Sequence, residues 1–162
     1  MDFARDILPL KDRLYRLALR LTMQHEEAED IVQDTLLKLW NIVSRGGQIE
    51  NIDAYAITMC RNLALDRLRQ NSRHIVSYDS ETMPEAPGEN PYDRIFVKEG
   101  VEIVNTLMAR MPEKLRTCMQ LRDFEGMSYH DISQALAISE DQVRVNIFRA
   151  RKFIKENLDG LS

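Results

Sequence analysis

The sequence lacks most of the features that mark secreted, membrane-bound or metal-binding proteins. Its 162 residues include only 2 cysteines, and Cys60 and Cys118 have no second Cys or His nearby at metal-ligand spacing. We expect both to be reduced core residues, since a free cysteine usually behaves as a small apolar side chain. No stretch approaches the roughly 20 apolar residues of a membrane span, and the start lacks the layout of a secretory signal. We therefore expect a cytoplasmic protein that does not insert into a membrane.

Catalytic patterns are missing as well. The chain contains no glycine-rich phosphate loop and no H-E-x-x-H zinc motif. A nucleophile, a base and an orienting group cannot be read together anywhere in the sequence. His25 and Glu29 stand four residues apart, but no further ligand accompanies them at a fixed spacing. We expect no enzyme activity, no cofactor and no metal site.

Charge of each sign is segregated along the chain. The net charge is −4, whereas nucleic-acid binding usually shows as a basic patch on a basic domain. However, residues 25–34 carry five acids without a base, and residues 79–93 carry another five. Residues 61–73 carry four arginines against Asp66 alone, and residues 144–155 carry five bases and no acid. The sequence therefore predicts at least two kinds of surface.

The pattern of helix formers and breakers predicts an all-α fold of two small domains. A run with Pro84, Pro87, Gly88 and Pro91 among acids cannot bury much apolar surface, so we expect a flexible, solvated linker there. We place the first domain at residues 1–72, the linker at 73–96 and the second domain at 97–162.

Three-and-four spacing of apolar residues predicts the individual helices. In the first domain we expect one around residues 10–21, one over 26–43 with Trp40 on its apolar face, and one over 52–70. In the second domain we expect a helix that ends near Met111, a helix that starts with Pro112 in its first turn and ends at Gly126, and two short helices that meet around residues 137–139.

The last two helices are typical of a helix-turn-helix unit. Ser128 with Asp131, and Ser139 with Gln142, have the spacing of a capping box at each helix start. Five apolar residues can close a core between the two helices, namely Ile132, Leu136, Ile138, Val143 and Ile147. The outward positions of the second helix then include several arginines. They suit DNA in the major groove, or they only complement the dipole of a solvated helix end.

Two other helices carry unusual residues. In the third helix, Asn62 is a poor helix former, and it either binds a nucleobase edge or caps a neighbouring carbonyl. In the second helix, Leu37 lies nearly opposite the apolar stripe, beside Asp30 and Asp34. It is either an ordinary exposed leucine or part of a surface for a basic, partly apolar protein.

These elements together resemble the extracytoplasmic-function (ECF) group of bacterial sigma factors over nearly the whole chain. Residues 28–40, A-E-D-I-V-Q-D-T-L-L-K-L-W, look like the clamp-binding helix of sigma region 2, and residues 54–69, A-Y-A-I-T-M-C-R-N-L-A-L-D-R-L-R, look like its promoter-melting helix. Residues 111–133 and 137–152 look like sigma region 4. The four motifs stand in the family's order, with a linker between the second and the third.

The resemblance implies a transcription initiation factor that gives core RNA polymerase its promoter specificity. It implies docking on the clamp of the largest polymerase subunit through Asp30, Gln33, Asp34, Leu37 and Lys38. It implies recognition and melting of the −10 element through Arg61, Asn62, Asp66 and Arg69. A flipped base would be held at Asn62, with residues 45–51 beside it. It implies that the last helix reads the −35 element or holds its phosphates through Gln142, Arg144, Val145, Asn146, Phe148, Arg149, Arg151 and Lys152.

The implied partners are promoter DNA, the clamp and the flap of the second-largest subunit of core RNA polymerase, and an anti-sigma factor that masks one or both domains. Thr58 and Asn146 depart from the family pattern, in which basic residues are common at these positions. Two other functions fit the residues less fully: a helix-turn-helix regulator that binds DNA alone, and a helical adaptor that binds only protein.

Overall fold

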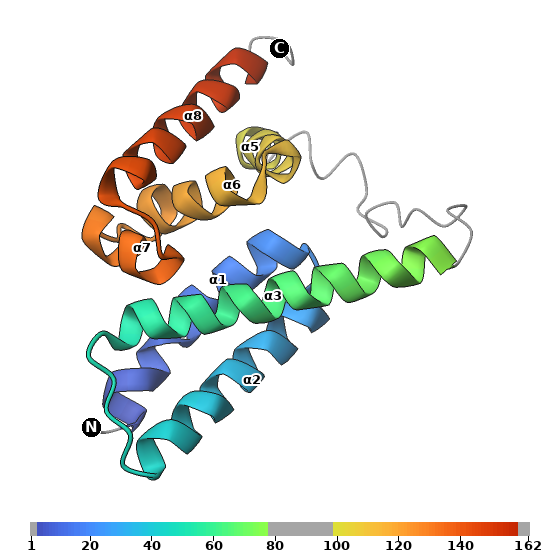
Figure 1. Cartoon of the computed structure of the whole chain (residues 1–162). Coiled ribbons are helices and arrows are strands. Elements are labelled where there is room, and N and C mark those ends of the chain that lie inside the picture. Colours follow the sequence, from blue (N-terminus) through green and yellow to red (C-terminus); the bar gives the residue numbers. More distant parts are fainter. Residues whose placement is uncertain (1–2, 78–98, 159–162) are drawn as a thin grey trace.

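The computed structural model describes residues 3–77 and 99–158, and their regular secondary structure is helical, which confirms the all-α prediction. The chain forms two lobes (Figure 1). The N-terminal lobe consists of η1 (Phe3–Ile7), η2 (Leu8–Leu10), α1 (Lys11–Thr22), α2 (His25–Ser44) and α3 (Ile52–Ser77). The C-terminal lobe consists of α5 (Glu99–Arg110), α6 (Glu113–Met119), η3 (Gln120–Phe124), α7 (Tyr129–Leu136) and α8 (Glu140–Leu158). Among the described residues, none of the helices is long and apolar enough to cross a membrane.

Helix α3 is longer than the sequence pattern predicted. It continues to Ser77 rather than ending near Gln70, so it includes residues 73–77, which we had assigned to the linker. No Gly or Pro interrupts residues 71–77, and the backbone hydrogen-bonding of the helix therefore continues. The rest of the predicted linker, residues 78–96, lies outside the described residues.

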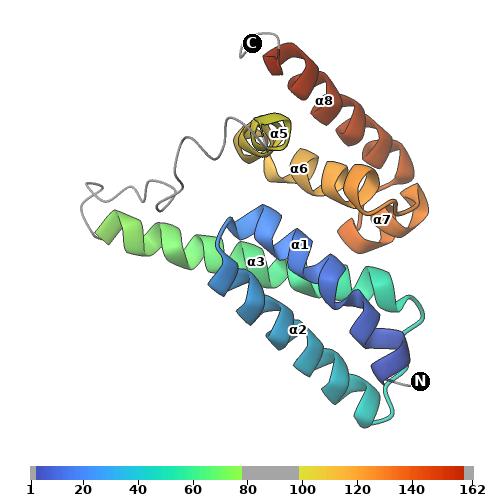
Figure 2. The same ribbon diagram turned by 180° about the vertical axis from the view of Figure 1, so that it is seen from behind.

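The N-terminal lobe is a bundle of α1, α2 and α3, seen from both sides in Figures 1 and 2. Leu14 and Leu17 of α1 and Ile31 of α2 are fully buried in it. The prediction for Trp40 was wrong, because its side chain is 47% exposed. Trp40 follows Leu37 by three residues, which places both on nearly the same side of the helix at about 100° per residue.

The C-terminal lobe contains the predicted helix-turn-helix unit. The Ser128 hydroxyl accepts a hydrogen bond from the Asp131 amide at 3.0 Å, and the Ser139 hydroxyl accepts one from the Gln142 amide at 3.0 Å. Both predicted hydroxyl caps are therefore confirmed. Ala137, in the left-handed conformation, ends α7 and lets the chain turn into α8. The second helix is not short as predicted, since α8 is 19 residues long.

One hydrophobic core crosses the boundary between the lobes. Leu14 and Cys60 of the N-terminal lobe belong to the same buried cluster as Leu121, Ile132 and Ile147 of the C-terminal lobe. A second, smaller cluster joins α5 and α6 to the far part of α8. Both cysteines are buried and free, as predicted. Burial raises the pKa of the Cys60 thiol to about 12, so this thiol stays protonated at neutral pH.

Leu121→Ala tests the contribution of the shared core. The side chain is fully buried, and its truncation leaves a cavity in addition to the lost burial, at a cost of about 2–5 kcal/mol in the free energy of unfolding. Urea unfolding followed by circular dichroism measures this loss. Leu158→Ala is a matched control on a partly exposed leucine. An equal effect of the two substitutions would contradict the assignment of Leu121 to the core.

Candidate nucleic-acid and protein interfaces

The outward face of α8 is both apolar and basic. The Phe148 side chain is 68% exposed, and Val145 is also exposed. Arg149 is exposed beside them and forms no ion pair with the residues that the structure describes. Lys152 is exposed and lies 3.9 Å from Glu156, a weak contact one turn further along the helix. Arg149 is therefore available to a ligand without first losing an ion pair in this part of the chain.

Arg144 is held at the start of α8 by several groups. Its guanidinium lies 3.1 Å from the Asp141 carboxylate, 3.9 Å from Glu140 and 5.0 Å from the centre of the Tyr129 ring. The guanidinium of Arg122 also lies over this ring, at 4.4 Å. Cation–π contacts of this kind orient a guanidinium. Tyr129 was not among the predicted functional residues, and the sequence offers no periodic signal for its contact with Arg144.

Arg151 binds a carboxylate of its own lobe. Its Nε donates to Asp123 at 3.0 Å, and an Nη atom donates to the second oxygen of the same carboxylate. This hydrogen bonding raises the pKa of Arg151 above its ordinary value. A DNA phosphate at Arg151 would therefore replace Asp123.

Asn146, which the resemblance implied as a −35 contact, is buried. Its side chain is 4% exposed, accepts a hydrogen bond from Gln142 Nε2 at 2.8 Å and approaches the Cys118 sulfur at 3.5 Å. At this buried position a long basic side chain would lose its hydration. Asn146 therefore contributes to packing between α6 and α8 and is omitted from the DNA-contacting set proposed below.

The predicted promoter-melting residues of α3 have different surroundings. Asn62 is exposed and its side chain has no hydrogen-bonding partner among the described residues, so here it does not cap a carbonyl. Asp66 and Arg69 are exposed and form an ion pair at 3.2 Å. A hollow of about 330 Å³ lies beside them, lined by Leu65, Leu68, Arg69 and Ser72. Arg61, by contrast, points to the C-terminal lobe.

The acidic helix α2 presents acids and apolar side chains on one exposed face. Leu37 is 60% exposed, and Gln33 and Lys38 are also exposed. The Asp30 and Asp34 carboxylates are about half exposed, and Arg67 of α3 lies 3.5 Å and 3.4 Å from them. Arg67 therefore orients the acids, a role that the sequence did not reveal. Trp40 extends the apolar part of the face.

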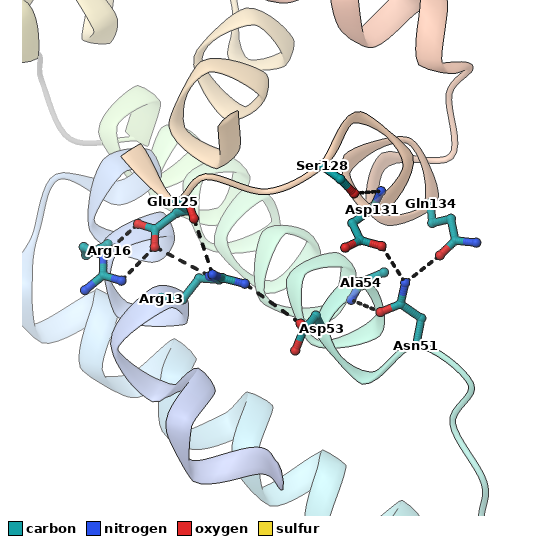
Figure 3. Close-up of polar contacts among 9 residues, drawn as sticks. All are labelled: Arg13, Arg16, Asn51, Asp53, Ala54, Glu125, Ser128, Asp131 and Gln134. Atoms are coloured by element: carbon teal, nitrogen blue, oxygen red, sulfur yellow. Dashed lines mark hydrogen bonds and ion pairs between the residues drawn. The ribbon is translucent and has the colours of Figure 1, made fainter. Parts of the chain in front are cut away.

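The two lobes meet in a polar interface, which we call the lobe interface (Figure 3). Its most buried charge is the Glu125 carboxylate, whose side chain is 1% exposed. Arg16 of α1 donates two hydrogen bonds of 2.7 Å to this carboxylate, and Arg13 forms an ion pair with it at 3.6 Å. Burial alone would raise the pKa of Glu125, but the hydrogen bonds and charge of Arg16, together with Gln120 and the charge of Arg13, lower the pKa below its ordinary value of 4.5.

Two further contacts extend the lobe interface along α3. Asn51, just before α3, donates to Asp131 at 3.1 Å and to Gln134 at 2.6 Å (Figure 3). The Thr58 hydroxyl lies 2.7 Å from the Ala135 carbonyl oxygen, to which it donates. Asn51 and Thr58 thus form hydrogen bonds from the N-terminal lobe to the C-terminal lobe.

Arg61 forms the third part of the lobe interface. It donates two hydrogen bonds, of 2.6 Å and 2.9 Å, to the Glu113 carboxylate of α6, and its side chain is only 16% exposed. Burial alone would raise the pKa of Glu113, but hydrogen bonds from Arg61 and Thr117 lower it below 4.5. A predicted DNA-facing arginine is therefore paired with the other lobe.

Comparison with known proteins matches both lobes to one group. Residues 7–74 match the Sigma-70 region 2 family, and residues 102–154 match the Sigma-70, region 4 family. The RNA polymerase sigma-H factor of Pseudomonas aeruginosa is 30% identical over 98% of this chain and 88% of its own length. The ECF RNA polymerase sigma factor SigE of Mycolicibacterium smegmatis is 29% identical over 91% of this chain, which spans 58% of that relative.

Solved structures share the fold. A co-crystal structure of the sigma factor RpoE in complex with the anti-sigma factor NepR from Bartonella quintana superposes with a TM-score of 0.78, at 24% identity, over 98% of this chain and 97% of that chain. A structure of CnrH in complex with the cytosolic domain of CnrY superposes with a TM-score of 0.71, at 19% identity, over 99% and 89%. Because each superposition covers nearly the whole chain, the shared fold includes both lobes.

Acid should weaken the lobe interface. Glu113 and Glu125 have pKa values below 4.5. The stability that these carboxylates give to the lobe interface is therefore fully present above pH 4.5 and is lost as the pH falls through the lowered pKa values. The groups that face them are Arg61, Arg116 and Thr117 at Glu113, and Arg13, Arg16 and Gln120 at Glu125. The radius of gyration from X-ray scattering should increase in acid before helical circular dichroism is lost. A constant radius up to global unfolding would contradict this assignment.

Proposed function

The chain belongs to the sigma-70 family of RNA polymerase sigma factors, and we propose that α2 docks on core polymerase while α8 and α3 read the promoter. As an ECF sigma factor it is a transcription initiation factor and not an enzyme. The proposal rests above all on the separate exposed faces of α2 and α8, one acidic and apolar, the other basic and apolar. We propose that the protein acts in the cytoplasm, where the polymerase and the promoter are found.

Helix α2 has the chemistry of a protein-docking surface. Asp30 and Asp34 attract a basic patch, and complementary charge accelerates encounter and selects the partner. Leu37 and Trp40 supply the apolar area that such an interface buries, and aromatic residues are enriched in interface cores. We propose that this face binds the polymerase clamp, with Gln33 and Lys38 at its margin. The C-terminal lobe would contact the flap of the second-largest subunit.

Helix α8 has the chemistry of a major-groove reader. A guanidinium can bind the O6 and N7 atoms of guanine together, and apolar side chains contact thymine methyl groups. We propose that Arg149, Phe148 and Val145 read bases of the −35 element. Arg144 and Gln142, at the start of the helix, would contact bases or the backbone, while Arg151 and Lys152 would bind phosphates.

Helix α3 supplies the second promoter contact. Extraction of a base from the duplex costs a few kcal/mol, and hydrogen bonds to the edge of the extracted base offset this cost. The exposed amide of Asn62 has both donors and acceptors for such an edge. We propose that Asn62 binds a flipped −10 base, with Arg61, Asp66 and Arg69 along the same helix.

An anti-sigma factor is a further proposed partner. The RpoE and CnrH structures described above are complexes, one with the anti-sigma factor NepR and the other with the cytosolic domain of CnrY. By analogy, we propose that a protein of this kind masks one or both lobes. The exposed apolar side chains of α2 and α8 are surfaces that such a partner could cover.

In vitro transcription tests the promoter-reading surface. With core polymerase and a promoter that the wild type transcribes, Arg149→Ala should reduce transcription at least about tenfold, because each lost bidentate base contact costs about 1–3 kcal/mol. Affinity for core polymerase should not change. Lys155→Ala removes one positive charge from the same helix, outside the proposed contacts, and should keep most of the transcription. Unchanged transcription by Arg149→Ala would contradict base reading by this residue.

Charge reversal tests the polymerase-docking surface. Asp30→Lys and Asp34→Lys should each weaken core polymerase binding by roughly tenfold or more, because like charges opposed across an interface cost several kcal/mol. A titration of labelled protein with core polymerase measures this loss, and circular dichroism checks that the fold survives the loss of the Arg67 contacts. Glu156→Lys reverses one acid of the C-terminal lobe as a control. If all three variants bound core polymerase as tightly as the wild type, α2 would not be the docking surface.

A further inference from the structure

The lobe interface covers part of the surface that would bind the −10 element. The Arg61 guanidinium lies against Glu113 with two charge-assisted hydrogen bonds, and only 16% of its side chain is exposed. Asn51, in the segment expected beside the base pocket, is hydrogen-bonded to Asp131 and Gln134. DNA could use Arg61 only after Glu113 has left it.

The same interface is extensive. Glu125 is bound by Arg16 and Arg13. Arg20 of α1 donates to Gln120 at 2.8 Å and to Asn105 at 2.7 Å, and so connects α1 to η3 and α5. Apolar side chains of both lobes form one buried cluster beneath these contacts. Contacts at several places along α1 and α3 thus stabilise a single relative position of the lobes.

The other two functional faces lie outside this interface. Leu37 of α2 and Phe148 of α8 are exposed while the lobes are closed. Figures 1 and 2 show α2 on the side of the N-terminal lobe away from α6 and α7, and α8 on the outer side of the C-terminal lobe. A partner of α2 can therefore bind without any change at Arg61.

We propose that this arrangement is a closed state in which Glu113 occupies the place of promoter DNA at Arg61, so that the protein docks on polymerase closed and binds the −10 element only after the lobes separate. This inference rests on the proposed function. A ligand that binds only the open state has its apparent affinity reduced by the fraction of open molecules. The carboxylate of Glu113 thereby lowers the affinity of the free protein for promoter DNA.

Neutral substitutions at the lobe interface test the closed state. Glu113→Gln and Glu125→Gln each remove one charge from the interface and leave every proposed DNA contact in place. Both should increase the radius of gyration measured by X-ray scattering. Both should also tighten binding of the free protein to the single-stranded −10 segment of a promoter that the wild type transcribes, by roughly three- to tenfold. Affinity for core polymerase should stay within about twofold, because α2 is already exposed.

Controls separate opening from simpler causes. Glu29→Gln removes one exposed acid of α2 outside the lobe interface, and should change neither the radius nor the DNA affinity; an equal gain in affinity there would attribute the effect to net charge and overturn the proposal. Arg61→Ala should increase the radius without tighter DNA binding. If a Glu variant loses helical circular dichroism, Gln134→Ala replaces it, since Gln134 is exposed and accepts from Asn51.

Failure of the closed state and failure of the proposed function can be distinguished. Folded variants with an unchanged radius and unchanged DNA affinity would overturn the closed state and leave the proposed function intact. Failure of the wild type to support transcription with core polymerase would contradict the proposed function. In that case the radius of gyration of Glu113→Gln still decides whether Glu113 holds the lobes together.

Discussion

The buried carboxylate of Glu125 is the contact on which the arrangement of the lobes depends. A charge without water is costly unless it is paired and hydrogen-bonded, and η3 alone provides only Gln120 as a partner, at 3.2 Å. The missing hydrogen bonds come from Arg16 on α1, in the other lobe. In the same interface α6 and α7 lie over α1 and α3, and Asn51, Thr58 and Arg61 make further contacts between the lobes. The lobes then share one hydrophobic core.

This arrangement gives the functional helices unequal access to partners. The acidic face of α2 and the outward face of α8 stay exposed, while α3 is open at Asn62 and covered at Arg61. The acidic composition of the chain is consistent with this division. Some acids face solvent on α2, where they suit a basic protein, and others neutralise arginines within the molecule. A net negative protein can therefore still bind DNA through local basic surfaces.

Carboxylates of the chain pair with several of the arginines that we propose as DNA contacts. Glu113 binds Arg61, Asp123 binds Arg151 and Asp141 binds Arg144. Arginine pairs with carboxylate and phosphate through the same planar, bidentate geometry. Under the proposed function, each of these arginines would exchange one partner for another on binding DNA, whereas Arg149 has no ion pair to exchange within the described part of the chain. Such exchange lowers the affinity for DNA. It also disfavours binding to unrelated anions, because a weak ligand cannot displace the internal carboxylate.

The sequence by itself determined the helical class, the helix-turn-helix unit with its Ser128 and Ser139 caps, and the identity of the acidic and basic helices, because these depend on local periodicity and on hydrogen bonds between residues three or four apart. It also sufficed for the resemblance to ECF sigma factors. Only the tertiary structure decided that Asn146 is buried, that Trp40 is exposed beside Leu37, and that Arg61 binds Glu113. These outcomes depend on which helices pack together, and the helices that do so are far apart in the chain: Asn146 lies 28 positions from Cys118, and Arg61 lies 52 positions from Glu113. Periodicity within one helix contains no information about that choice.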